Sequence, residues 1–209
     1  LQPLEKEWAS LLLAALSAFC VYTCMYAFRK PFTAANYSNL KFLSIDYKVW
    51  LVVAQTVGYT LSKFFGIKFI GELKNEKRST IILLFIGTAW LALLFFAVTP
   101  APYNMLFLFI NGFPLGVIYG LVFSYIEGRR STELLGAVLA SSFIFASGFT
   151  QSVGKYILLD WNVSKWWMPF VTGGIFIVPT ILFTRLLERT PRPDQQDIGL
   201  RCSHIREPD

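Results

Sequence analysis

The chain has 209 residues, of which 55% are hydrophobic and only 15% are charged. Soluble domains carry about 25% charged residues, so a soluble fold of this composition would leave large apolar patches on its surface. The composition therefore predicts an all-α, polytopic membrane protein in a lipid bilayer. The net charge of +6 comes from basic residues near the ends of apolar segments, which indicates membrane topology and no nucleic-acid partner.

Six apolar segments follow one another along the chain. Each has at least ~19 residues, and a helix needs about 20 residues to cross ~30 Å of hydrocarbon. Helices are expected because backbone polar groups in lipid must be paired within the segment. The predicted spans are residues 8–35, 47–70, 80–98, 104–126, 134–158 and 166–187. Residues 1–188 are thus expected to form a six-helix transmembrane bundle, and residues 189–209 a polar cytoplasmic linker or tail.

The connecting segments differ in charge. Basic residues are concentrated at Lys6, Lys74, Lys77, Arg78, Arg129, Arg130 and the chain after residue 184, whereas the opposite side holds Lys41, Lys48, Lys155 and Lys165. The positive-inside rule then predicts a multi-pass protein of the plasma (inner) membrane with both termini in the cytoplasm.

Small residues mark predicted helix–helix contacts. They recur at four-residue spacing in two of the spans, at Gly58, Ser62 and Gly66 and at Gly112, Gly116 and Gly120. Such stripes let helix backbones approach closely in membranes. Pro31, near the end of the first span, is expected to bend that helix or to free a carbonyl group.

Two cations, Arg29 and Lys63, fall within the first two spans with no acidic residue at matching depth. A charge in the hydrocarbon core is tolerated when it has a partner or a function. One interpretation is that both side chains extend to the lipid headgroups. The other is that they line a water-accessible cavity that attracts an anion, for which the planar fork of arginine is well suited.

Polar side chains accompany both cations. Tyr26 lies about one turn before Arg29, and Gln55, Tyr59 and Lys63 recur at four-residue spacing, which predicts one shared helix face. These residues are candidates for a polar cavity lining, and interhelical hydrogen bonding or packing is the alternative.

The motifs resemble those of the N-terminal six-helix half of a major facilitator superfamily transporter, and most closely those of the organophosphate:phosphate antiporters. The resemblance rests on Tyr26-Ala27-Phe28-Arg29-Lys30-Pro31-Phe32, on Tyr59 with Ser62-Lys63-Phe64, on Asn111-Gly112 and Gly116, and on Asp197-Ile198-Gly199-Leu200-Arg201. It covers nearly the whole chain. That family exchanges glycerol phosphate or hexose phosphate for inorganic phosphate.

The resemblance implies a secondary-active transporter half that moves a small organic or phosphorylated anion by alternating access. It implies that Arg29 binds phosphate and that Lys63 lines the same cavity. Together with their polar neighbours, the predicted substrate-binding residues are Arg29, Lys63, Tyr26, Tyr59, Gln55, Lys30 and Asn111. The resemblance also implies a second six-helix half as partner, in the same full-length chain or in a partner chain. We expect the same full-length chain.

The sequence departs from the family's pattern at several places. The family's helix-five histidine is replaced near Phe145, the span 104–126 lacks the Gly-Trp-Pro-Pro stretch, and the loop at residues 71–78 is degenerate. These departures place the chain in a divergent bacterial branch and favour, as an alternative function, a non-transporting membrane sensor or assembly subunit. No metal cluster, paired acid and base or nucleophile turn is evident, so we expect no enzymatic activity, catalytic residue, metal or cofactor.

Overall fold

The computed structural model describes residues 2–38, 40–73, 77–126 and 132–190. Along these ranges the chain forms the helices α1 (Gln2–Tyr26), α2 (Tyr47–Glu72), α3 (Arg78–Val98), α4 (Met105–Ile126), α5 (Thr132–Leu159) and α6 (Met168–Glu188). A 3-10 helix, η1 (Pro31–Ala34), and two paired two-residue strands, β1 (Lys41–Phe42) and β2 (Ile45–Asp46), connect α1 to α2. The predicted all-α class is confirmed, apart from this short antiparallel ribbon.

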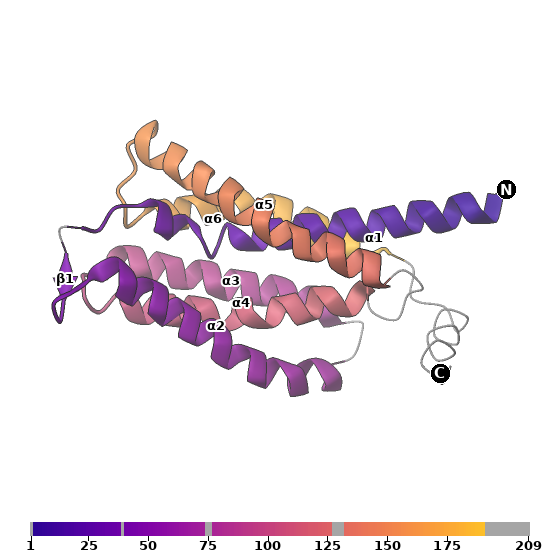
Figure 1. Cartoon of the computed structure of the whole chain (residues 1–209), viewed down its shortest axis with the longest axis horizontal. Coiled ribbons are helices and arrows are strands. Elements are labelled where there is room, and N and C mark those ends of the chain that lie inside the picture. The colour runs from indigo at the N-terminus through magenta and orange to yellow at the C-terminus, as the bar shows by residue number, and fades with distance from the viewer. Residues whose placement is uncertain (1, 39, 74–76, 127–131, 191–209) are drawn as a thin grey trace, which may run out of the picture.

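The six helices run up and down along one long axis (Figure 1). The ribbon formed by β1 and β2 lies at one end of the bundle, which we call the ribbon end. The first turn of α3 and the last turns of α2 and α6 lie at the opposite end, where α1 extends beyond the other helices. Successive helices therefore enter the bundle from alternate ends.

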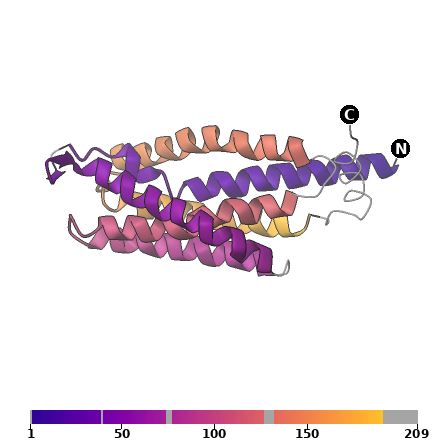
Figure 2. The ribbon, with the colours of Figure 1, turned by 60° about the horizontal axis from the view of Figure 1, so that its bottom comes forward.

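The helices pack in two groups joined at the centre. α4 packs against α2 and α3, whereas α1 packs against α5 and α6; α1 also contacts α4, and α3 contacts α6. Figure 2 shows α5 lying along α1 on one side of the bundle, with α2 crossing the other side. α1 and α4 thus occupy the centre, and α2 and α5 lie at the margins.

Four helices, α3, α4, α5 and α6, are long and apolar enough to cross a membrane. α1 has a shorter apolar stretch, Leu11–Tyr26. α2 is 26 residues long, but its apolar sequence is interrupted by polar side chains such as Gln55 and Lys63. The length and composition of the four apolar helices indicate an integral membrane protein.

The first helix ends earlier than the sequence predicted. The expected span reached residue 35, but α1 ends at Tyr26. The N–H groups of Phe28 and Arg29 bond to carbonyls only three residues back, at 3.1 and 3.0 Å, and Pro31 lacks the N–H group that would continue the helix. Arg29 therefore follows α1 in a tight turn and does not lie within the helix.

Both small-residue stripes lie in a helix–helix contact, as predicted, and the structure shows that the second and fourth spans meet each other there. A Cβ atom added to Gly58 would collide with the carbonyl oxygen of Phe109, and one added to Gly112 would collide with the carbonyl oxygen of Gln55. The backbones of α2 and α4 are therefore in direct contact, which only glycine permits at these two positions.

Candidate anion-binding site

Two buried amide side chains hold the chain where α1 ends. Asn111 on α4 donates from Nδ2 to the carbonyl oxygens of Phe28 at 3.1 Å and Ala89 at 2.9 Å. Gln55 on α2 donates from Nε2 to the carbonyl oxygen of Arg29 at 3.0 Å and to Oδ1 of Asn111 at 2.8 Å. Side chains from two neighbouring helices thus satisfy carbonyls that the interrupted helix leaves free, as a low-polarity environment requires. This network fixes the backbone of Arg29.

The side chains of Arg29 and Lys63 meet at one aromatic ring. The guanidinium carbon of Arg29 lies 3.8 Å from the centroid of the Tyr59 ring and 5.6 Å from that of Tyr26. The ammonium nitrogen of Lys63 lies 4.9 Å from the same Tyr59 centroid. These distances are within the range of cation–π attraction. Two cations from different segments are therefore brought together around Tyr59.

Neither cation has a carboxylate partner in the part of the chain that the structure describes, where the one ion pair joins Arg185 to Glu188. Arg29 is half-buried, and its Nε atom is buried without a hydrogen-bond partner. Lys63 is exposed on α2. A buried donor on a charged group costs free energy when it has no acceptor, so an anion placed beside Arg29 would be stabilised.

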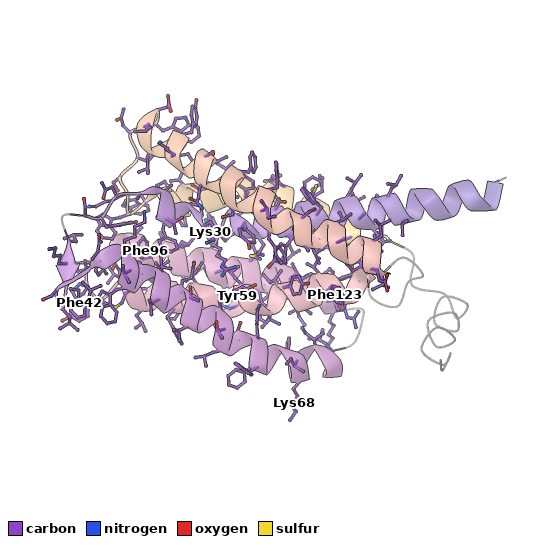
Figure 3. The ribbon with its side chains drawn as sticks, viewed as in Figure 1. Lys30, Phe42, Tyr59, Lys68, Phe96 and Phe123 are labelled. Carbon is purple, nitrogen blue, oxygen red and sulfur yellow. The ribbon has the colours of Figure 1, made fainter. Side chains whose placement is uncertain are left out.

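An aromatic cluster that the sequence reasoning missed lies behind these cations. The hydroxyl oxygens of Tyr22 and Tyr59 are 3.3 Å apart. The Tyr22 ring also packs against Phe143 on α5 and Tyr119 on α4, with centroids 4.8 and 5.6 Å apart. The four-residue spacing of Tyr22 and Tyr26 could have indicated a tyrosine face on this helix. The cluster joins α1, α2, α4 and α5 around Tyr59, which lies inside the bundle in Figure 3.

The other predicted site residues differ in their surroundings. Gln55 and Asn111 are buried, at 5% and 0% exposure, with their amides engaged in interhelical hydrogen bonds, which is the alternative that the sequence left open. Lys30 is half-buried beside Arg29 and lies within the bundle in Figure 3, whereas Lys68 points away from it.

The predicted shared face of Gln55, Tyr59 and Lys63 is only partly right. Gln55 and Tyr59 are buried and Lys63 is exposed. Lys63 follows Gln55 by eight residues. At 3.6 residues per turn, eight residues rotate a helix by about 80° more than two full turns, and this rotation carries Lys63 out of the buried face.

Some sequence motifs lie outside the described residues, namely the stretch Asp197–Arg201 and the basic residues Lys74, Arg129 and Arg130. Within the described residues, no three His, Cys, Asp or Glu side chains gather in a way that could hold a metal ion. The chemistry available to the candidate site is therefore that of a guanidinium, an ammonium and tyrosine hydroxyls, which together can attract and hydrogen-bond an anion.

No curated protein and no solved structure matches the chain. A family model described as a family of unknown function (DUF5690) matches residues 31–208. The matched range begins at Pro31, two residues after Arg29, and includes every helix after α1. The chain belongs to this family.

Proposed function

We propose that the chain is a six-helix half of a secondary-active transporter of the major facilitator type, which moves a small organic or phosphorylated anion by alternating access. The observation that carries the proposal is the meeting of Arg29 and Lys63 at the Tyr59 ring, without an acidic partner among the described residues. Charges in an apolar bundle mark substrate pathways when they lack structural partners. An arginine fork can give two hydrogen bonds to one oxyanion.

The packing of the helices supports the choice of fold. The contact pattern repeats when each helix is replaced by the helix three positions further on, counting the six helices cyclically. The α1–α5 contact then corresponds to α4–α2, and the α1–α6 contact corresponds to α4–α3. The α1–α4 and α3–α6 contacts correspond to themselves. All of these contacts are present. Because α1 and α4 enter from opposite ends (Figure 1), the arrangement resembles two inverted three-helix repeats, which occur within each half of major facilitator transporters.

We infer that all six helices cross the plasma membrane, with both termini in the cytoplasm. Arg78, Arg185 and Arg189 lie at the end of the bundle away from the ribbon, which is the cytoplasmic end by the positive-inside rule. α1 and α2 are the less apolar spans because they carry the anion site. A second six-helix half, packed against this one, would complete the cavity, since substrate sites of such transporters lie between repeats.

The test is anion exchange by the full-length protein in proteoliposomes, with inorganic phosphate loaded inside and labelled phosphate or glycerol phosphate outside. Arg29→Lys keeps the charge but removes the planar fork, and we expect it to abolish phosphate-linked exchange with unchanged expression. Lys68→Gln is the matched control, because Lys68 points away from the bundle (Figure 3), and it should exchange normally. Full activity of Arg29→Lys would reject the assigned role.

The alternative, a membrane sensor or assembly subunit, has a distinct outcome in the same assay. The close packing of Tyr22, Tyr119 and Phe143 behind Tyr59 is compatible with a rigid site that binds an anion without moving it. Saturable phosphate binding that depends on Arg29, combined with no flux in proteoliposomes, would favour this alternative over transport.

A further inference from the structure

A shallow, open depression, which we call the groove, lies along one face of α6 towards the end of the helix that carries arginines. Its cavity has a volume of about 480 Å³ and is lined by Val178, Ile181, Leu182, Leu186, Arg185 and Arg189. Val178 and Leu182 are 72% and 62% exposed. The groove therefore presents an apolar floor with two guanidinium groups at one end.

The dimensions of this groove match one leaflet of a bilayer. Val178 and Arg189 are separated by ~16 Å along the helix at 1.5 Å per residue, and half of a hydrocarbon core is about 15 Å. From Trp167, which caps the start of α6, to Arg185 the helix rises ~27 Å. With Trp167 at one interface, Arg185 lies near the opposite one, at the height of lipid headgroups.

The charge at the end of the groove is positive. Nη1 of Arg185 contacts Oε2 of Glu188 at 3.3 Å, and both side chains are well exposed. Exposed pairs of this kind are weak, so the guanidinium of Arg185 can rearrange towards another anion. Arg189 is exposed and makes no ion pair among the described residues. Two cations and one carboxylate leave a net attraction for negative charge.

We propose that this groove binds one anionic phospholipid. The acyl chain lies along Val178, Ile181 and Leu182, and the phosphate lies between Arg185 and Arg189. The combination of an apolar groove of leaflet length with cations at headgroup height fits a molecule that has a long apolar tail and a negative head. The proposal requires α6 to be in the membrane and is independent of anion transport at Arg29.

The test is native mass spectrometry of the delipidated full-length protein in detergent, titrated with phosphatidylglycerol and with phosphatidylcholine of the same acyl chains. We expect the first phosphatidylglycerol to bind more tightly than phosphatidylcholine. Each basic residue near an anionic surface contributes about fivefold in affinity, so the double variant Arg185→Gln/Arg189→Gln should lose roughly 25-fold for phosphatidylglycerol and little for phosphatidylcholine.

Two further variants separate a defined site from general attraction to a basic surface. Leu182→Trp fills the groove without removing charge and should weaken the binding of the first phosphatidylglycerol, and folding is preserved because Leu182 is exposed. Lys68→Gln removes an exposed cation from α2 and should leave that binding unchanged. Equal affinity for the two lipids, an equal loss in Lys68→Gln, or no loss in the double variant would each overturn the proposal.

Discussion

The guanidinium carbon of Arg29 lies 3.8 Å from the centroid of the Tyr59 ring. An aromatic ring attracts a cation without neutralising it, so the positive charge of Arg29 stays available to a ligand, which a carboxylate partner would not permit. The backbone of Arg29 is also held by the Gln55 amide at 3.0 Å. α2 thus fixes both the backbone and the side chain of Arg29, and the proposed anion site is organised without a ligand.

The role of the Tyr59 ring can be separated from that of its hydroxyl group. Tyr59→Phe removes the 3.3 Å contact with Tyr22 but keeps the ring under Arg29, and phosphate affinity should change less than ~3-fold because a cation–π contact needs only the ring. Tyr59→Leu removes the ring and should weaken phosphate binding by roughly 2- to 30-fold, the equivalent of 0.5–2 kcal/mol. Isothermal titration calorimetry of the full-length protein with inorganic phosphate measures both. Equal effects of the two substitutions would contradict this role.

Asn111 is expected to act mainly on stability. Asn111→Leu keeps a similar side-chain volume but leaves the carbonyls of Phe28 and Ala89 and the amide of Gln55 short of a partner. Each buried polar group without a partner costs about 1–3 kcal/mol, so we expect a loss of at least ~2 kcal/mol in the free energy of unfolding. Thermal unfolding in detergent measures the loss.

The matched control for Asn111 is Asn36→Leu, because Asn36 is exposed and its side chain accepts only a local bond from the Ser38 N–H. The free energy of unfolding of the Asn36→Leu variant should change by less than about 0.5 kcal/mol, as for most surface substitutions. An Asn111 variant as stable as this control would show that the hydrogen bonds joining α2, α3, α4 and the turn after α1 contribute little.

Short-range sequence rules predicted some features and missed others for identifiable reasons. The composition and length of the apolar segments predict the helices, because lipid requires internal backbone pairing. The small-residue spacing predicts that α2 and α4 each make a close helix contact, because close approach requires glycine at positions such as Gly58 and Gly112. Both rules depend only on neighbours within one segment.

The pairing of Gln55 with Asn111 and with the carbonyl of Arg29 depends on contacts between segments 26 and 56 residues apart, and no local pattern specifies it. The end of α1 is a related case. Pro31 predicts an interruption, but the position of the last helical residue, Tyr26, depends on which side chains donate hydrogen bonds to the freed carbonyls. The sequence therefore identified Arg29 and Lys63 as candidates without showing that Tyr59 lies between them.

Two glycines offer a paired test of the α2–α4 contact. Gly112→Ala would place a Cβ against the carbonyl oxygen of Gln55, whereas a Cβ on Gly87 of α3 meets nothing within 4 Å. Because backbone cannot move aside as a side chain can, we expect Gly112→Ala to cost ~3 kcal/mol or more. Gly87→Ala should leave stability unchanged or slightly raised, since alanine favours helix over glycine by about 1 kcal/mol.

Thermal unfolding of the two glycine variants in the same detergent measures the difference between them. A Gly112 variant that unfolds at the same temperature as the Gly87 variant would mean that α2 and α4 are further apart in the membrane than their contact in the structure indicates. Exchange activity should fall with the Gly112 variant alone, because the same contact positions Tyr59 beside Arg29.

In the proposed six-span topology, hydropathy gives the weakest support to the crossing of the membrane by α2. Single cysteines can test this crossing. Lys41 lies at the ribbon end before α2, and Lys77 lies after it at the opposite end; both are exposed. In a background without native cysteines, Lys41→Cys should react with an impermeant maleimide in intact cells, and Lys77→Cys only after permeabilisation, because the positive-inside rule places the end near Lys77 in the cytoplasm. Ser164→Cys, exposed between α5 and α6, should behave like Lys41→Cys. If positions 41 and 77 are labelled from the same side, α2 does not span, and Lys63 would then lie at the membrane surface instead of beside Arg29 in a transport pathway.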